Sequence, residues 1–201
     1  MNRPVVVALS AVGFLVLLAL GIVGWGISVY NGLVTADESV RGSWAQVENQ
    51  YQRRFDLIPN LVETVKGFAK QEREVLENVT AARARVGQLT VTPEVLRDPQ
   101  AFARFQQAQD GLSQALSRLL VVTENYPNLK SDQNFLSLQS QLEGTENRIA
   151  VERRRYNEVI QDFNIRIRRF PASLIAGMAG FQAVPYFEAA PSAEQAPQVK
   201  F

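Results

Sequence analysis

The first apolar stretch of the chain is continuous rather than periodic. It runs from Val5 to Val29 without a charged side chain, and Trp25 and Tyr30 lie near its C-terminal end. A helix of about 20 apolar residues crosses a bilayer, and Trp and Tyr favour the membrane–water interface. Residues 1–30 are therefore predicted to form a cytoplasmic N-terminus and a single transmembrane anchor.

A cleaved signal peptide is the alternative interpretation, with residues 34–36 (VTA) as the cleavage site. The apolar run is longer than the roughly 7–15 residues of a signal-peptide core, which favours an anchor. Arg3 precedes the run, whereas Asp37, Glu38 and only one cation, Arg41, follow it. Because basic residues stay in the cytoplasm, this asymmetry predicts a domain outside the cytoplasm.

Beyond the anchor, apolar positions recur every three or four residues, which predicts long amphipathic helices. Pro59 lacks a backbone donor and clashes with the preceding turn, so a kink or break is expected near Ile58. Ser131 or Asp132 is the expected N-cap of the last helix. The expected helices run from the membrane to about 58, then over about 61–86, 99–126 and 131–170.

Apolar stripes on these helices must be buried against one another. The expected fold is all-α, with an N-terminal transmembrane helix followed by an antiparallel up-and-down four-helix bundle over residues 31–187. The stripes are Val40, Trp44, Val47, Tyr51, Phe55 and Ile58 on the first helix; Leu61, Val65, Phe68, Val75, Val79 and Val86 on the second; Phe102, Phe105, Gln109, Leu112, Leu116, Leu119, Thr123 and Tyr126 on the third; and Phe135, Leu138, Leu142, Thr145, Ile149, Glu152, Tyr156, Val159, Phe163, Ile167 and Phe170 on the fourth.

The chain after the fourth helix has two parts. Residues 171–187 are apolar but are interrupted by Gly and Pro. They are expected to fold back along the bundle with Phe181, Tyr186 and Phe187 as anchors, and membrane contact is the alternative. Residues 188–201 are rich in Ala, Pro, Gln and Ser, a composition typical of a flexible tail.

Composition removes several classes of function. The 201 residues include no Cys and no His, which excludes disulfides, thiol nucleophiles, the Ser-His-Asp triad and most zinc or haem sites. Apart from Arg3, the basic side chains balance the 20 acidic ones. A neutral domain binds polyanions poorly, so no nucleic-acid partner is expected. No cofactor is expected either, and the chain is not predicted to be an enzyme.

Polar side chains lie around Pro59 and along the third and fourth helices. Buried polar groups must bond to one another, and such groups can fix the register between helices. The interpretation favoured is one structural interhelical network, and a binding or catalytic cleft is the alternative. The network is predicted to contain Arg54, Asn60, Glu63, Asn125, Asn134, Glu146, Asn147, Arg148, Tyr156 and Asn157.

A basic segment on the fourth helix is the predicted interaction face. It consists of Arg153, Arg154 and Arg155. Exposed cations attract anionic lipid or an acidic partner. The simpler interpretation is a solvated face with pairs such as Arg154 with Glu158, four residues apart.

Several short motifs are similar, in order, to those of a known protein family. They are Tyr30–Val34, Trp44–Glu48, Arg54–Phe68, Glu124–Lys130, Thr145–Ile149, Tyr156–Asn157, Asn164 and Phe170–Pro171. Together they resemble the signature of the LemA family over about residues 29–187. Two departures are mild: Arg153–Arg155 is unusually basic, and Phe163 stands where Tyr is common.

The resemblance implies a bacterial inner-membrane protein with one N-terminal helix, an up-and-down four-helix bundle and no established enzymatic activity. It also implies links to envelope proteolysis and, in one branch, to magnetosome membranes. A membrane protease system is therefore one expected kind of partner, alongside the lipid bilayer. The motif residues carry over as structural positions rather than catalytic ones.

Three functional hypotheses follow. The first is a membrane-anchored scaffold or adaptor for envelope proteins. The second is a self-assembling structural membrane protein, a homo-oligomer. The third and weakest is a carboxylate metal enzyme, because di-iron bundles pair Glu with His and the chain has no His. Its candidate ligands are Glu63, Glu124, Glu146 and Glu152.

Overall fold

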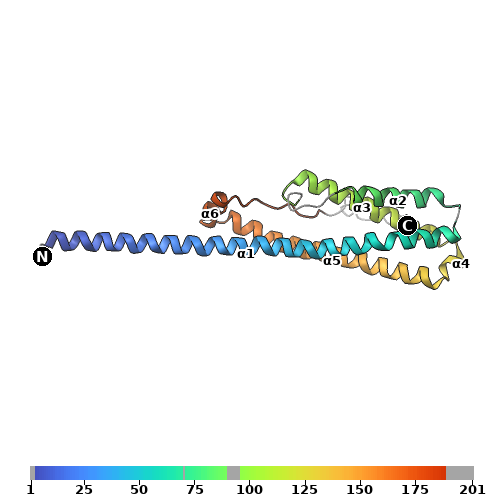
Figure 1. The fold of residues 1–201 in the computed structure, drawn as a ribbon, viewed down its shortest axis with the longest axis horizontal. Coiled ribbons are helices and arrows are strands. Elements are labelled where there is room, and N and C mark those ends of the chain that lie inside the picture. The colour runs from blue at the N-terminus through green and yellow to red at the C-terminus, as the bar shows by residue number, and fades with distance from the viewer. Residues whose placement is uncertain (1–2, 70, 90–95, 189–201) are drawn as a thin grey trace, which may run out of the picture.

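The computed structural model describes residues 3–69, 71–89 and 96–188, and these residues form helices and connections without a strand (Figure 1). The all-α prediction is therefore confirmed for the described part of the chain. The helices are α1 (Arg3–Phe68), α2 (Arg73–Gly87), α3 (Pro99–Thr123), α4 (Pro127–Lys130), α5 (Gln133–Arg168) and α6 (Ala172–Ala179). The predicted tail, 188–201, lies outside these residues apart from Glu188.

The predicted break at Pro59 is wrong, because α1 continues through it to Phe68. A proline in a helix leaves the carbonyl one turn earlier without its donor. Here that carbonyl belongs to Phe55, and it accepts a hydrogen bond from Arg83 Nε of α2 at 3.3 Å. The Arg83 guanidinium also lies 3.8 Å from the centre of the Phe55 ring. A contact from a neighbouring helix thus replaces the lost bond.

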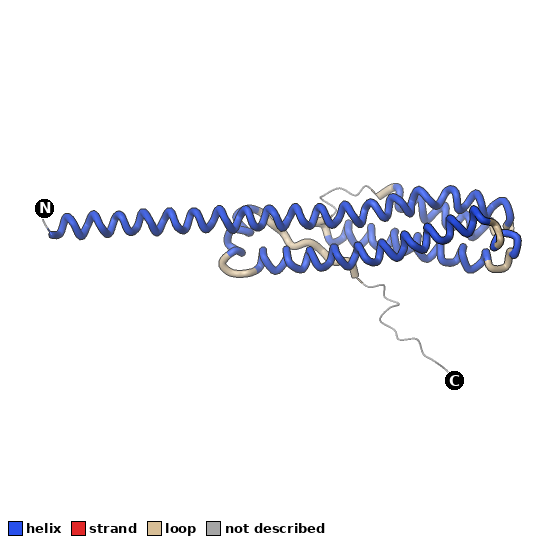
Figure 2. Tube along the Cα trace, turned by 90° about the horizontal axis from the view of Figure 1, so that it is seen from below, coloured by secondary structure: helices blue, strands red, loops and turns tan. Residues whose placement is uncertain are grey.

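The N-terminal part of α1 projects beyond the other helices (Figures 1 and 2). Within the described residues it is the one helix long and apolar enough to cross a membrane, and its apolar window is not buried in the protein. The remaining part of α1 lies beside α5 along most of its length, and α2 lies beside α3.

The buried side chains form two separate cores. The proximal core, nearer the projecting segment, is rich in aromatic rings, and the distal core is almost entirely aliphatic. The proximal core contains Leu33, Ala36, Val40, Trp44, Val47, Tyr51, Leu96, Phe102, Phe105, Ile149, Tyr156, Ile160, Phe163, Ile167, Ala176, Val184 and Phe187. The distal core contains Ile58, Leu61, Val65, Ala69, Leu76, Val79, Leu112, Leu116, Leu119, Leu129, Phe135 and Leu142.

The stripes predicted for the two long later helices match the structure closely. Every member of the third stripe that falls within α3 is buried, including Gln109 and Thr123. Asp132 caps α5, because its side chain accepts from the Phe135 N–H at 2.9 Å. Phe170 is the exception: it is 76% exposed, since α5 ends at Arg168 and the chain turns away at Pro171.

After α6 the chain folds back along the bundle as an extended segment, residues 181–188, here called the strap (Figure 1). Gly180 makes this reversal with φ of 77°, a left-handed conformation that suits glycine. Phe187 is buried as predicted, but Tyr186 is 42% exposed. Val184, which was not predicted, is buried instead.

Candidate functional site

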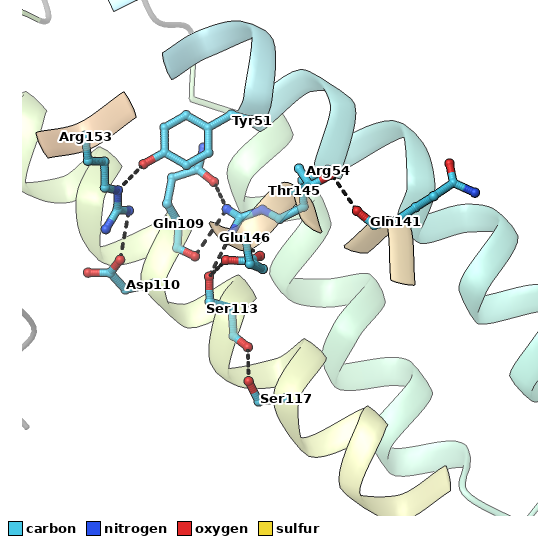
Figure 3. A network of polar contacts seen from close by, with 10 residues as sticks. All are labelled: Tyr51, Arg54, Gln109, Asp110, Ser113, Ser117, Gln141, Thr145, Glu146 and Arg153. Carbon is cyan, nitrogen blue, oxygen red and sulfur yellow. Dashed lines mark hydrogen bonds and ion pairs between the residues drawn. The ribbon is translucent and has the colours of Figure 1, made fainter. Parts of the chain in front are cut away.

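An arginine side chain lies buried between the two cores. Arg54 of α1 is 1% exposed, and its guanidinium donates at 2.7 Å both to Ser113 Oγ of α3 and to Glu146 Oε1 of α5. It also donates to the backbone and side-chain oxygens of Gln109, and Ser113 donates to Glu146 Oε2 at 3.2 Å. Figure 3 shows these side chains converging from three helices.

This polar layer joins α1, α3 and α5 through one guanidinium. A buried cation is tolerated only where it is paired and hydrogen-bonded. Sliding α3 by one turn would remove Ser113 and Gln109 from Arg54, and sliding α5 would remove Glu146. The layer pairs the buried guanidinium with a carboxylate, although Arg54 Nε has no hydrogen-bond partner among the described residues.

A second set of contacts lies beside this layer. Arg153 of α5 donates at 2.6 Å to the phenol oxygen of Tyr51 and at 2.9 Å to Asp110 of α3 (Figure 3). Burial raises the pKa of Tyr51, and the charge of Arg153 offsets part of that rise. Burial works against the charged form of Arg153, but Tyr51 and Asp110 outweigh it and raise the pKa of Arg153. Arg153 is thus a fixed cation that joins three helices.

The strap is held by side-chain amides rather than by another strand. Asn164 of α5 donates to the Val184 carbonyl at 2.9 Å and accepts from the Val184 N–H at 3.0 Å. Asn157 makes the same pair of bonds with Phe187, both at 2.9 Å. Gln106 of α3 does so with Glu188, at 2.8 and 3.3 Å. Each amide satisfies both backbone groups of one residue, as a neighbouring strand would.

These three amides place the strap in a groove between α3 and α5. Among the described residues, a cavity of about 660 Å³ lies beside the C-terminal end of the strap, along α5. Arg154 and Glu158 of α5 are exposed on its wall. The full lining is Ser113, Glu146, Ile149, Ala150, Arg153, Arg154, Asn157, Glu158, Gln161, Tyr186, Phe187 and Glu188.

The ten residues predicted to form one polar network do not meet in one place in the structure. Arg54 and Glu146 meet, and Asn157 binds the strap. Tyr156 is buried in the proximal core, where its hydroxyl has no hydrogen-bond partner among the described residues and burial raises its pKa. The other six are exposed: Asn60, Glu63, Asn125, Asn134, Asn147 and Arg148.

The three arginines of the predicted interaction face also differ in their contacts and exposure. Arg153 is bound to Tyr51 and Asp110, so only Arg154 and Arg155 are exposed. Arg155 pairs with Glu152 at 2.8 Å. The expected pair of Arg154 with Glu158 is not among the ion pairs of the described residues. Arg154 therefore faces the groove as its exposed cation.

The four carboxylates of the metal hypothesis do not converge. Glu146 binds Arg54, Glu152 pairs with Arg155, Glu63 pairs with Lys66, and Glu124 is exposed. Within the described residues no group of three metal-ligating side chains comes together. Nothing in their geometry supports a metal centre.

Several contact residues were missed by the sequence reasoning. Gln109 had a signal, since it occupies a core position of an apolar stripe. Asn164 lies in a recognised motif, but its partner, Val184, is a backbone group in a segment without periodicity. Ser113, Asp110 and Gln106 carry no local signal that separates them from solvent-exposed polar residues.

The exposed apolar part of α1 is long enough to cross a membrane, and packed helices follow it. These features define the class of membrane-associated helical proteins. The model of the LemA family matches residues 43–201, and the chain belongs to the LemA family.

Named relatives agree with this placement. The chain is 28% identical over 181 residues to Magnetosome protein MamQ of Magnetospirillum gryphiswaldense, covering 82% of this chain and 66% of that protein. It is 26% identical over 181 residues to Magnetosome protein MamQ 2 of Paramagnetospirillum magneticum, with the same coverage of 82% and 66%. It is 22% identical over 159 residues to Protein LemA of Metamycoplasma hominis, covering 79% of this chain and 68% of that protein. The chain thus spans just under two thirds of the length of the MamQ relatives.

Proposed function

We propose that this protein is a membrane-anchored scaffold that holds an extended segment of an envelope protein in the groove between α3 and α5. In this proposal it catalyses no reaction and needs no cofactor. The anchor lies in the bacterial inner membrane, and the bundle lies outside the cytoplasm. The orientation rests on Arg3 before the apolar run and on the acidic residues that follow it.

The proposal includes an antiparallel up-and-down bundle. Arg54 contacts Glu146, and Tyr51, three residues earlier in α1, contacts Arg153, seven residues later in α5. These pairs run in opposite directions along the two helices. That order supports an antiparallel arrangement of α1 and α5.

One observation carries the proposal: the groove already holds an extended segment of the chain itself, through side-chain amides. These amides are already bonded to the strap, so a second extended segment would lie beside it, against the exposed side chains of Gln161 and Arg154. The open cavity of about 660 Å³ continues from the strap. Arg154 on its wall would face a carboxylate of the bound segment.

The kinship with MamQ supports an architectural role. Those relatives are named as magnetosome proteins, and neither their names nor that of Protein LemA states an enzymatic activity.

Photocrosslinking in cells tests the proposal. A photoreactive amino acid at Gln161, which lines the groove, should give a discrete adduct with one envelope protein. The same probe at Val121, 67% exposed and outside the groove, should not. Arg154→Glu should abolish the adduct, because it reverses the exposed charge in the groove. Arg155→Glu, the same change one residue along and outside the lining, should leave it.

Two outcomes contradict the scaffold role. Absence of a Gln161-specific adduct removes the groove as a docking site. An adduct with a second copy of this chain alone favours the alternative, a self-assembling structural protein.

A further inference from the structure

Helix α6 lies beside the apolar end of α1. The side chain of Ile175 in α6 comes within 3.8 Å of where a Cβ at Gly26 would lie. The ring of Phe181, just after α6, lies 6.2 Å from that of Tyr30. In Figure 1, α6 is at the end of the bundle nearest the projecting segment.

The outer face of this region is strongly apolar. Phe170 is 76%, Leu174 61% and Met178 90% exposed. Leu174 and Met178 are four residues apart and thus share one face of α6. An apolar cavity of about 400 Å³ lies between this helix and α1, lined by Val23, Gly26, Ile27, Tyr30, Ile175, Met178 and Ala179. It contains no charged side chain.

The length of the apolar run places α6 at the edge of a bilayer. The run from Val5 to Val29 has about 25 residues and as a helix measures about 37 Å, whereas the hydrocarbon core is about 30 Å thick. Trp25 and Tyr30 favour the membrane–water interface, which places the last few residues of the run where acyl chains meet headgroups. Gly26, which Ile175 approaches, is one of them.

Cations lie next to this region in the chain. Arg166, Arg168 and Arg169 are exposed at the end of α5, directly before the turn into α6. Arg166 pairs with Asp162 at 2.8 Å, but no ion pair is described for Arg168 or Arg169. Apolar side chains next to two cations that have no ion pair among the described residues form the pattern of a surface that rests on an anionic leaflet.

We infer that α6 and the turn before it are a second membrane contact: Phe170, Leu174 and Met178 enter the acyl boundary, an acyl chain fills the cavity against α1, and Arg168 and Arg169 bind anionic headgroups. This contact fixes the bundle against the membrane surface instead of leaving it free to swing about α1. It is independent of any partner in the groove between α3 and α5.

Depth-dependent fluorescence quenching tests this inference in the full chain. Because the chain has no Cys, Met178→Cys accepts a single environment-sensitive dye. The protein is reconstituted in phosphatidylcholine–phosphatidylglycerol vesicles that carry a lipid spin-labelled near the headgroup. The dye at 178 should be quenched about twofold, as expected for an interfacial helix. Val121→Cys, also exposed but far from α6, is the matched control and should not be quenched.

Equal quenching at the two positions would overturn the inference. A second result would also overturn it: a dye at 178 whose emission is blue-shifted but not quenched, and changes with the protein-to-lipid ratio. That result would assign the apolar face to a second copy of the chain. The basic pair is tested by Arg168→Gln with Arg169→Gln. Quenching at 178 should rise with phosphatidylglycerol in the parent and not in the double variant; a parent indifferent to phosphatidylglycerol would overturn the headgroup contact.

Discussion

The proximal and distal cores solve the same packing problem in different ways. The distal core is formed mostly by Leu, Ile and Val side chains of the helices, together with Ala69 from the connection after α1. The proximal core includes a non-helical segment, since Val184 and Phe187 of the strap are buried in it. There Trp44 contacts four other rings at centroid distances between 5.4 and 6.1 Å, those of Phe102, Phe105, Tyr156 and Phe187.

The difference shows how a bundle keeps a groove between two of its helices. Rings span more space than aliphatic side chains, so α3 and α5 can stand apart in the proximal half. The strap then fills part of that space, and amides satisfy its backbone. The Arg54 layer marks the boundary between the two halves.

Trp44→Ala should cost about 4 kcal/mol of unfolding free energy, because it removes the ring at the centre of the proximal core. Leu119→Ala, at a fully buried position of the distal core, should cost about 3 kcal/mol. Denaturant unfolding of the reconstituted chain measures both. Limited proteolysis separates the halves: only Trp44→Ala should expose the strap to cleavage. Cleavage of the strap in both variants would show that the two cores are not distinct.

Glu146→Ala should cost about 3 kcal/mol, because it leaves the Arg54 guanidinium buried without its carboxylate. This value is at the low end of the usual range, since Glu146 is 34% exposed. The double change Arg54→Leu with Glu146→Leu should recover about half of the loss. Glu143→Ala, an exposed carboxylate on the same helix, is the control. A double variant no more stable than Glu146→Ala would contradict the structural role of the pair.

Asn164→Ala should cost about 2 kcal/mol, because both backbone groups of buried Val184 lose their partner. Gln106→Ala should cost less, about 0.5 kcal/mol, since its bonds to Glu188 are exposed to water. Both costs are measured by denaturant unfolding. Equal costs would mean that burial does not decide how firmly each amide holds the strap.

Tyr156→Phe should stabilise the protein by about 1 kcal/mol, because it removes a buried hydroxyl without a described partner. The pKa of Tyr156 is raised by burial, so the folded state favours the protonated phenol. The unfolded chain releases the phenol proton near the ordinary tyrosine pKa of about 10, whereas the folded protein retains it. The free energy of unfolding is therefore unaffected by this proton below about pH 10 and falls as the pH rises above that value. The variant should therefore lose less stability than the parent between about pH 9 and 11. Tyr186→Phe, exposed on the strap, should change neither quantity.

Local patterns predicted the two later long helices well, but not the boundary between the first two, which lies after Phe68 rather than near Ile58. The buried positions of α3 and the Asp132 cap follow from spacing and from one side chain near its own backbone. Pro59 misled the prediction because its compensation is not local: the Phe55 carbonyl is satisfied from Arg83, 28 residues away.

The contacts of the candidate site were less accessible. Arg54 and Glu146 were both identified, but Gln109 and Ser113 join them only once three helices take their register. Asn125 and Asn134 were expected in that network, yet both are exposed near helix ends. Polar residues at such positions form hydrogen bonds with water and with the backbone of turns. The amides that hold the strap pair with backbone, which leaves no pattern in the sequence.

Hydrogen exchange of the strap tests most directly the claim that the groove holds an extended segment through side-chain amides. The amides of Val184 and Phe187 donate to Asn164 and Asn157, whereas no such bond is described for Tyr186. The account predicts slow exchange at 184 and 187, fast exchange at 186, and loss of protection at 184 in Asn164→Ala. Uniformly fast exchange across 181–188 in the parent protein would contradict it.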